Sequence, residues 1–318
     1  MILALAGGVG GARMAQGLVQ VLGADELAIV VNVGDDFEHL GLHVSPDLDT
    51  VMYTLGGVHN SETGWGRAGE TWNFLDALGA IGGDTWFRLG DRDLAVHVER
   101  TRRLRSGDRL SGITADLCRA FGIRHAVIPA TDDRLRTFVD TDEGELAFQD
   151  YFVRRRCEPV VRGFRFDGAS SARVAAPLAA LAALDSSAAR IEGIVLCPSN
   201  PWLSVAPMLA LPALAALLDA QDIPVVAVSP IVSGAAVKGP AGKIMRELGH
   251  AVDVSGVVTH YGARVGGWVI DERDRSHAGA IAAAGHGVCV TDTMMTSPAR
   301  SAALALEAIA LLRRLGRR

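Results

Sequence analysis

Short apolar runs, each followed by turn-forming residues, recur along the chain and predict a mostly parallel β-sheet. The runs Ile2–Ala6, Leu27–Val33 and Ile191–Leu196 are mostly apolar, which is typical of strands that are buried on both faces. Stretches with apolar residues at helical spacing, such as Ala12–Leu22 and Pro298–Leu315, separate or follow such runs. Strands and helices that alternate in this way predict a three-layer, Rossmann-like α/β fold.

The same pattern predicts the remaining elements and the division of the chain. We expect strands at Pro224–Val228, Val254–Val258 and Val288–Val290, a short strand at Glu145–Phe152, and helices at Thr50–Leu55, Trp65–Phe74, Leu110–Phe121 and 207–220. Between about residues 59 and 189 tryptophans cluster and the density of charge rises. We therefore expect a single α/β domain over 1–318, with its core at 1–58 and 190–318 and a smaller inserted α+β subdomain at 59–189.

Composition narrows the classes of function. With 318 residues, 49% of them hydrophobic, the chain can bury a large core. A net charge of −5 gives no electrostatic reason to expect a nucleic-acid partner. The four cysteines are far apart and fit neither a disulfide framework nor a zinc-binding spacing, so we expect a reducing, cytoplasmic setting. The first apolar segment is too short for a signal sequence or a membrane span, and no membrane partner is expected.

The first strand runs directly into a glycine-rich turn, Gly7-Gly8-Val9-Gly10-Gly11, and the next stretch is helical. Glycine allows the backbone to approach a phosphate closely, while the start of a helix offers free N–H groups and positive dipole. The spacing matches neither the dinucleotide-binding GxGxxG nor the Walker GxxxxGK[ST] motif. Taken alone, the turn is equally compatible with a phosphate site and with a tight structural turn.

An acidic stretch, Asn32 to Thr50, follows the second strand and contains Asp35, Asp36, Asp47 and Asp49. Carboxylates beyond the carboxyl end of a parallel strand are well placed to hold Mg²⁺ or to orient a hydroxyl group. The alternative is that Asp47 caps the following helix and that Asp35-Asp36 is a solvated turn. Helix capping does not explain Asp49, which lies inside an apolar run. His39 and His43 offer further metal ligands, although loop histidines are usually bystanders.

Three later segments carry further polar candidates. Phe87–Ala95 interleaves arginine and aspartate, an arrangement that forms an ion-pair cluster or presents guanidinium groups to a ligand. The loop Cys197–Ser204 contains Ser199 and Asn200, which suit hydrogen bonds to a base, ribose or phosphate. Lys238, beside Gly239, is a natural phosphate contact at the end of another strand, or is simply solvent-exposed.

Taken in order, these motifs resemble the 2-phospho-L-lactate transferase family of coenzyme F420 biosynthesis (CofD/FbiA-like). The resemblance rests on the segments Ala6–Arg13, Asn32–Asp36, Asp47–Tyr53, Phe87–Ala95, Cys197–Ser204, Val228–Ile231, Lys238–Pro240 and Thr291–Met295. It implies a Mg²⁺-dependent phosphotransferase. A phospho-acid group (2-phospho-L-lactate, or its enolpyruvyl or glyceryl analogue) would pass from its guanosine diphosphate-activated form to the deazaflavin Fo, with release of GMP. It also implies a homodimer that acts on small molecules.

The resemblance also implies roles for individual residues. Asp49 contacts the ribityl hydroxyl of Fo and is a possible Mg²⁺ ligand, and Arg88 is a second contact to Fo. The diphosphate is approached by Gly7, Gly8, Gly10 and Gly11, and the guanosine side is formed by Ser199, Asn200 and Lys238. Asp35 and Asp36 are implied as metal ligands or as hydrogen-bond partners of the deazaflavin.

Two other classes remain as alternatives. The YvcK-like (gluconeogenesis factor) proteins share this type of fold and glycine turn, but they resemble a nucleotide-sugar-binding regulator; Phe87–Ala95 and Cys197–Trp202 favour the transferase. A nicotinamide-dependent oxidoreductase requires GxGxxG and an acidic residue at the end of the second strand. Asp35 lies near that position, but the glycine spacing differs.

Overall fold

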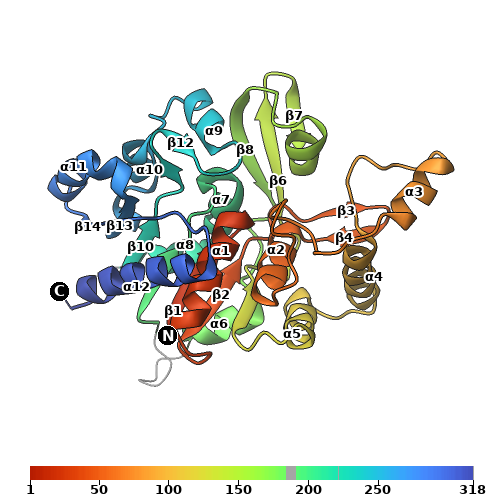
Figure 1. Cartoon of the computed structure of the whole chain (residues 1–318), viewed down its shortest axis with the longest axis horizontal. Coiled ribbons are helices and arrows are strands. Elements are labelled where there is room, and N and C mark those ends of the chain that lie inside the picture. The colour runs from red at the N-terminus through yellow and green to blue at the C-terminus, as the bar shows by residue number, and fades with distance from the viewer. Residues whose placement is uncertain (184–190, 221, 318) are drawn as a thin grey trace.

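A seven-stranded sheet, parallel throughout, forms the centre of the protein (Figure 1). The computed structural model describes residues 1–183, 191–220 and 222–317. In spatial order the strands are β14 (Gly287–Thr291), β13 (Gly267–Asp271), β10 (Val225–Val228), β9 (Gly193–Leu196), β1 (Ile2–Ala6), β2 (Leu27–Val31) and β5 (Ala126–Pro129). The five inner strands from β13 to β2 are buried along their whole length, because helices cover both faces of the sheet.

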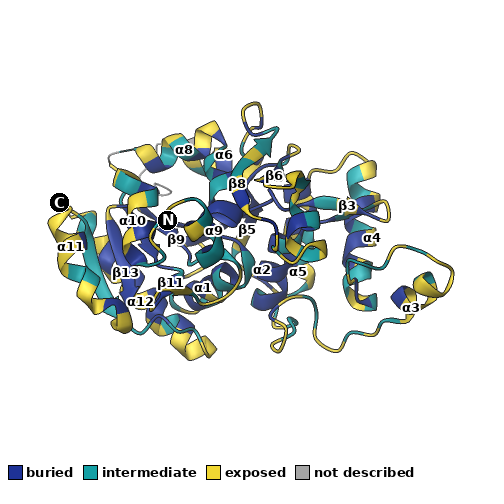
Figure 2. Cartoon of the chain, turned by 90° about the horizontal axis from the view of Figure 1, so that it is seen from above, coloured by how far each residue is buried: buried dark blue, intermediate teal, exposed yellow. Residues whose placement is uncertain are grey.

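Helices lie on both sides of the sheet and make the three predicted layers. On one side are α1 (Gly8–Val21) and α12 (Pro298–Leu315), which pack against each other; α2 (Pro46–Leu55) packs on α1. On the other side are α6 (Ala176–Ala183) and α8 (Pro212–Asp219) (Figures 1 and 2). The predicted three-layer α/β class is confirmed.

Smaller elements surround this core. The strands are β3 (Phe37–His39) with β4 (Leu42–Val44), β6 (Arg136–Thr141) with β7 (Gly144–Ala147) and β8 (Val161–Asp167), and β11 (Ile231–Val232) with β12 (Ala235–Ala236). The helices are α3 (Asn73–Ala80), α4 (Asp91–Arg105), α5 (Leu110–Ala120), α7 (Ala206–Leu209), α9 (Ala241–Glu247), α10 (Val254–Tyr261) and α11 (Ala278–Ala283). Short π-helical turns cover Asp150–Arg154 and Pro201–Val205, and 3₁₀ turns cover Gly262–Arg264 and Glu272–His277.

The strand predicted at Val254–Val258 is wrong, because these residues begin helix α10. The side chain of Asp253 accepts a hydrogen bond from the Gly256 N–H group (3.1 Å) and so caps the helix. The buried residues of α10 recur at helical spacing, and Tyr261 continues the buried face. The strand that fills this place in the sheet is β13, which the sequence pattern did not identify.

Three other predicted elements also differ from the structure. The segment predicted as helix Trp65–Phe74 is mostly loop, in which Gly66 and Gly69 have positive φ, and α3 begins only at Asn73. The strand predicted at Glu145–Phe152 ends at Ala147 and is followed by a π-helical turn. The helix predicted over 207–220 is divided into α7 and α8, because Pro212 starts a new helix.

The segment 59–189 does not lie wholly outside the core. Its strand β5 pairs with β2 at the edge of the central sheet, with Val30 opposite Ile128. The rest of the segment supplies the three-stranded sheet β7-β6-β8 and the lobe formed by α3 and α4, which lies on the far right in Figure 1. The boundary proposed at residues 189 and 190 falls outside the described residues.

Strand order explains where a ligand can bind. The chain moves from β1 to β2 and β5 on one side, then returns to β9, β10, β13 and β14 on the other side of β1. The carboxyl ends of β1 and β9 therefore flank the point where the strand order reverses, which is where open α/β sheets bind ligands. The glycine turn follows β1 at this point, and the loop Cys197–Ser204 follows β9.

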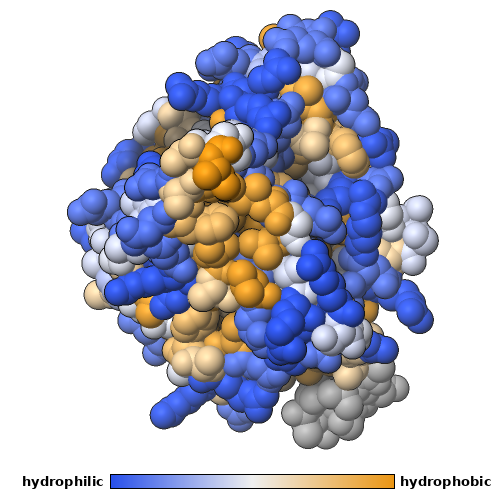
Figure 3. Space-filling model, turned by 90° about the vertical axis from the view of Figure 1, so that its right-hand side faces the viewer, coloured by the Kyte–Doolittle hydropathy of each residue, from blue (hydrophilic) through white to orange (hydrophobic). Residues whose placement is uncertain are grey.

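Apolar residues also reach the surface. Figure 3 shows a band of apolar side chains on the face that carries α3 and α4, whose exposed large side chains include Phe74, Ile81 and Val98. Among the described residues, no single helix is long and apolar enough to cross a membrane. Pro201–Leu209 and Pro212–Asp219 meet that test only as a pair, which is bent by 96°.

The contact between α1 and α12 depends on a glycine, and this gives a first prediction. A Cβ atom at Gly17 would overlap the backbone carbonyl of Ser301 in α12. Gly17→Ala is therefore expected to lower the free energy of unfolding by about 1–3 kcal/mol, although alanine favours the helix by about 1 kcal/mol. Gly112→Ala in α5, where no atom lies within 4 Å, is the control and should be neutral or stabilising. Urea unfolding of both variants measures the difference, and equal stabilities would contradict this account of the packing.

Candidate functional site

The glycine turn is held in place by side chains from two other segments. The Gly7 N–H group donates a hydrogen bond to Ser199 Oγ (3.0 Å), and the Gly8 N–H group donates to Asp47 Oδ1 (2.6 Å). Gly8 has a φ of 64°, which favours glycine. A Cβ atom at Gly10 would overlap the carbonyl oxygen of Pro198. The turn therefore needs glycine both for its conformation and for its close contact with the loop after β9.

A cavity of about 690 Å³ opens beside this turn. Most residues predicted for the site line it: Gly7, Gly8, Gly10, Asp35, Asp49, Arg88, Ser199, Asn200 and Lys238. Gly11 and Asp36 do not line this cavity. Its walls also contain several aromatic side chains, including Trp65, Trp86 and Phe148. The cavity thus combines a possible phosphate-binding turn with an apolar compartment large enough for a cofactor-sized ligand.

The predicted guanosine-side residues and Arg88 already have partners in the protein. The Asn200 side-chain oxygen accepts hydrogen bonds from the N–H groups of Trp202 (3.0 Å) and Leu203 (3.1 Å), so it caps the following turn. Lys238 Nζ donates to the carbonyl of Thr63 (2.7 Å), and partial burial lowers the pKa of Lys238. The guanidinium of Arg88 stacks over Trp72 at 4.2 Å from the ring centre. Their proposed ligand contacts remain predictions.

Two of the four aspartates form a buried pair around Asn32. The Asn32 side-chain amide donates to Asp47 Oδ2 (3.0 Å) and to Asp35 Oδ1 (3.2 Å). Burial raises the pKa of Asp47 from 3.8 to about 6. Burial, together with the nearby charges of Asp47 and Asp36, raises the pKa of Asp35 well above its usual value. Among the residues that the structure describes, neither carboxylate forms an ion pair with a basic side chain.

Asp36 and the two loop histidines have different surroundings. Asp36 Oδ2 lies 2.9 Å from His43 Nε2 and accepts a hydrogen bond from Ser45 Oγ (2.9 Å). His39 instead packs edge-on against Trp86 and belongs to an aromatic cluster. The two histidines lie on the hairpin that β3 and β4 form.

Asp49 has its charge balanced by a fully buried arginine. Both terminal nitrogens of the Arg100 guanidinium donate to the Asp49 carboxylate: Nη1 donates to Oδ2 (3.1 Å), and Nη2 donates to Oδ1 through a shorter bond. Arg100 is 1% exposed and lies behind the cavity wall, which does not include it. Burial alone would lower the pKa of Arg100. The negative charge of Asp49 more than offsets this effect, so the pKa of Arg100 is raised. The pair fixes the plane of the Asp49 carboxylate.

A second aspartate and a histidine complete this network. His97 Nδ1 lies 3.2 Å from Arg100 Nη1, and His97 Nε2 lies 3.2 Å from Asp93 Oδ1. Because arginine only donates, Nδ1 must accept, which leaves the ring proton on Nε2, the nitrogen that faces Asp93. The hydroxyl of Tyr53 also donates to Asp93 (2.5 Å). Asp49, Asp93 and His97 are close enough to hold a metal ion, but the guanidinium of Arg100 already supplies the positive charge there.

Arg100 and His97 are not among the site residues predicted from the sequence, although their spacing contains a signal. Asp93, His97 and Arg100 are separated by four and three residues, so they share one face of α4. A helix face that carries only charged or titratable groups is either solvated or turned toward a charged partner. The partner is Asp49 in α2, which is 51 positions away in sequence.

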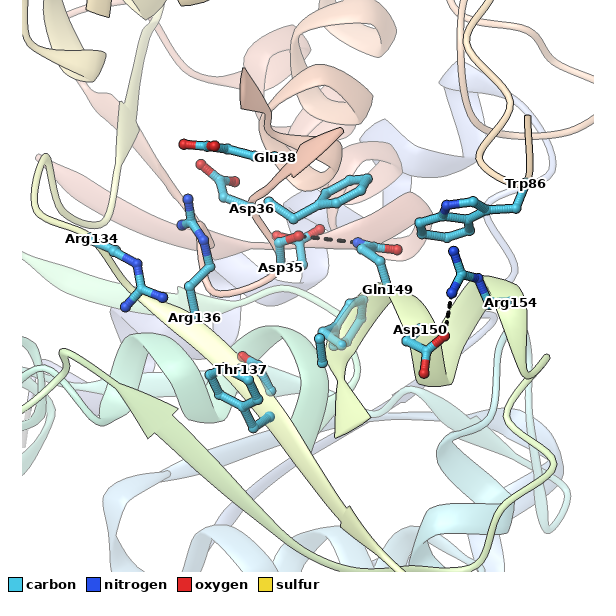
Figure 4. A pocket seen from close by; sticks show the side chains of 14 residues that line it. Asp35, Asp36, Glu38, Trp86, Arg134, Arg136, Thr137, Gln149, Asp150 and Arg154 are labelled. Atoms are coloured by element: carbon cyan, nitrogen blue, oxygen red, sulfur yellow. Dashed lines mark hydrogen bonds and ion pairs between the residues drawn. The ribbon is translucent and has the colours of Figure 1, made fainter. Parts of the chain in front are cut away.

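A second cavity, of about 470 Å³, lies on the other side of Asp35 (Figure 4). It shares Asp35, Trp86, Phe148 and Gln149 with the larger cavity. Figure 4 shows the side chain of Gln149, which donates a hydrogen bond to the Asp35 backbone carbonyl (3.1 Å). Asp36, Arg134, Arg136 and Arg154 also line this second cavity.

Comparison with known proteins identifies the family. The model of the family described as 2-phospho-L-lactate transferase CofD matches residues 2–297. A phosphoenolpyruvate transferase of Streptomyces griseus is 39% identical over 316 residues, which cover 98% of this chain and 98% of that protein. A 2-phospho-L-lactate transferase of Methanosarcina mazei is 36% identical over 304 residues, which cover 96% of this chain and 98% of that protein.

A solved structure also has the same fold. A member of the UPF0052 family from Bacillus halodurans superposes with a TM-score of 0.60 over 97% of this chain and 98% of that chain. Their sequences are only 12% identical, so this similarity concerns the fold alone. The family match and the two relatives span almost the whole chain and agree with the ordered motifs around the cavity. This chain belongs to the CofD family of 2-phospho-L-lactate transferases.

Proposed function

We propose that this CofD-family enzyme acts in coenzyme F420 biosynthesis and transfers a phospho-acid group from its guanosine diphosphate-activated form to the deazaflavin Fo. The terminal ribityl oxygen of Fo forms a bond to the phosphorus next to the acid. The bond from that phosphorus to GMP breaks, and the hydroxyl proton is released. The partners are thus small molecules, and the expected setting is a cytoplasmic homodimer.

One observation carries this proposal: the glycine turn and the carboxylate of Asp49 line the same cavity. Phosphoryl transfer depends mainly on placing the two substrates in line and on balancing charge. The start of α1 offers N–H groups and positive dipole to a diphosphate. Asp49, fixed by Arg100, offers a charged acceptor for the hydroxyl of the second substrate.

We assign Asp49 to orienting the hydroxyl and not to holding a metal ion. Both oxygens of Asp49 accept hydrogen bonds from Arg100. Each oxygen can still accept one further hydrogen bond. The positive charge of Arg100 makes binding of a metal cation to the same oxygens unfavourable. Burial raises the pKa of Asp49, although the charge of Arg100 opposes this rise. Because Arg100 contacts both oxygens, we assign Asp49 to orienting the hydroxyl. Arg88 remains the second proposed contact to Fo, since it lines the aromatic part of the same cavity.

We propose Asp35 and Asp47 as the protein ligands of Mg²⁺. Their buried carboxylates meet at the Asn32 amide, and oxygen ligands of this kind suit a hard divalent cation. Within the described residues, Asp35 and Asp47 accept hydrogen bonds from neutral amide groups, whereas Asp36, also considered from the sequence, lies 2.9 Å from the titratable ring of His43. Bound Mg²⁺ would supply positive charge next to the diphosphate.

For the donor acid we propose the enolpyruvyl form. The Streptomyces griseus relative is named a phosphoenolpyruvate transferase, and relatives with that name from Streptomyces avermitilis and Nocardia farcinica are 40% and 38% identical. The relative named for 2-phospho-L-lactate is 36% identical. The three acids differ by a few atoms, so discrimination among them requires few contacts.

The activity itself is the first test of this function. Purified protein supplied with Fo and a mixture of the three guanylyl-activated acids is expected to form mainly the enolpyruvyl phosphodiester, and only with Mg²⁺ present. Mass spectrometry identifies the product, and a chelator provides the control. A protein that turns over none of the donors but binds nucleotide sugars tightly would instead be a YvcK-like regulator.

The second test addresses the Asp49–Arg100 pair. Arg100→Lys keeps the positive charge but loses the two-point contact, so the Asp49 carboxylate is free to rotate. We expect kcat to fall by about 10- to 100-fold while KM for the donor is little changed, and Asp49→Asn should lower kcat at least as far. Arg102→Lys, at an exposed position of the same helix, is the matched control. Unchanged kcat in Arg100→Lys would remove this pair from the mechanism.

A third test uses the stability of the protein without substrates. Because the pKa of Asp47 is about 6 when folded and 3.8 is its ordinary value, the folded state holds an extra proton between these values. The free energy of unfolding should fall as pH rises through about 4 to 6, by up to about 3 kcal/mol for this group. Asp47→Asn should flatten this dependence, and Mg²⁺ should stabilise the wild type at pH 7.5 but not the variant.

Urea unfolding at several pH values, with and without Mg²⁺, measures these effects. Asp25→Asn changes an exposed carboxylate and serves as the control, with stability within about 0.5 kcal/mol of the wild type. Equal stabilisation of the wild type and Asp47→Asn by Mg²⁺ would place the ion elsewhere.

A further inference from the structure

A loop between α2 and α3 reaches across to the glycine turn. Residues 59–67 form this strap. At its tip, a Cβ atom at Gly64 would lie 2.5 Å from Lys238 Nζ and 3.3 Å from Val9 Cγ1 in the glycine turn. The next residue, Trp65, lines the larger cavity. The strap therefore lies beside the turn at which the diphosphate of the donor is proposed to bind.

The strap is bonded mainly to itself. The N–H group of Asn60 donates to the carbonyl of Gly66 (3.0 Å) and closes the tip into a compact loop. Among the described residues, one hydrogen bond joins residues 60–66 to another segment, and Lys238 Nζ donates it to the carbonyl of Thr63 (2.7 Å). A loop that is bonded internally and held at its tip by one bond can move as a unit.

The two ends of the strap allow such a movement. Gly57 and Gly69 flank it, and both have a positive φ (68° and 66°), a conformation that glycine adopts without strain. At the base of the strap, His59 Nδ1 and Arg67 Nε are buried and have no hydrogen-bond partner among the described residues. Because unpaired buried groups are unfavourable, the strap loses little when its base shifts.

The donor and the strap share a contact. Lys238 is proposed to bind the donor, and it also holds the carbonyl of Thr63 in the strap. Trp65 is 45% exposed although it lines the cavity, so its indole ring would gain apolar contact when a ligand fills the space beside it. A donor bound at the glycine turn would thus hold the strap against the cavity.

The chemistry of the donor gives this cover a purpose. In transfer, the ribityl oxygen bonds to the phosphorus next to the acid, and the bond to GMP breaks. Water can attack the same phosphorus: its oxygen forms the bond, the bond to GMP breaks, and its two protons pass to phosphate oxygens or to solvent. GMP and the free phospho-acid are then lost without product. Closing a cover over the site suppresses such a side reaction.

We propose that the strap, residues 59–67, closes over the bound donor and that Trp65 keeps water from the reacting phosphorus, so that the enzyme favours transfer over hydrolysis. This inference rests on the proposed function, since it concerns the fate of the same donor. Trp65 acts here by excluding the competing nucleophile, and Asp49 keeps its role of orienting the hydroxyl.

Trp65→Ala tests the proposal through the ratio of GMP released to phosphodiester formed. With Fo, the activated donor and Mg²⁺, we expect a ratio of about one for the wild type and about three or more for Trp65→Ala, because water then competes for the phosphorus. Trp65→Phe keeps an aromatic cover and should stay close to the wild type. Phe74→Ala, at an exposed aromatic residue that lines neither cavity, is the control and should keep a ratio of about one.

Gly64→Val provides a second variant that leaves the tryptophan in place. Its side chain would overlap Lys238 Nζ and Val9 and hold the tip of the strap away from the turn, so its ratio should also rise. A ratio that stays at one in both Trp65→Ala and Gly64→Val, with only KM for a substrate raised, would make Trp65 a simple binding contact and overturn the inference. An equal rise in Phe74→Ala would also overturn it. A wild type that forms no phosphodiester would instead overturn the proposed function.

Discussion

The buried ion pair between Asp49 and Arg100 is the interaction on which the arrangement of the site depends. Arg100 comes from α4, in the lobe formed by α3 and α4, whereas Asp49 comes from α2, which packs on the core helix α1. The buried face of α4 contains His97, Arg100 and Thr101 in addition to Val96. This helix is therefore attached largely through polar contacts, so the same pair that orients a carboxylate toward the cavity also fixes the lobe that closes it.

A polar attachment of this kind has an energetic consequence. Removing either member of a buried ion pair leaves an uncompensated charge and costs about 3–5 kcal/mol, although the intact pair adds little net stability. What the pair provides is direction: arginine holds a carboxylate at two points, and His97 and Asp93 hold the arginine in turn. An apolar contact of the same area would allow the helix to shift or rotate with much smaller loss.

Much of the core follows from local sequence, whereas the site depends on contacts between distant segments. β1 and α12 have the predicted bounds because one is a continuous apolar run and the other repeats apolar residues at helical spacing between Ser297 and Gly316. The strand predicted at Val254–Val258 is wrong because valine favours strands in general, whereas here Asp253 caps a helix. No local pattern reveals that β5 joins the central sheet or that Arg100 meets Asp49, since both are set by chain topology.

The two sides of the cavity differ in how completely their polar groups are bonded within the protein. On the side of β9, Ser199 accepts from Gly7 and Asn200 accepts from its own turn. On the side of β2, Asp35 and Asp47 are buried and form no ion pair within the described part of the chain, and Asp36 Oδ1 has no hydrogen-bond partner there. Buried polar groups that are incompletely paired raise the free energy of the folded protein, and a partner that binds them recovers this cost. In the proposed function, the metal ion and the acceptor bind on this side, so their binding energy would be available on the side of the incoming hydroxyl, where in-line attack needs it.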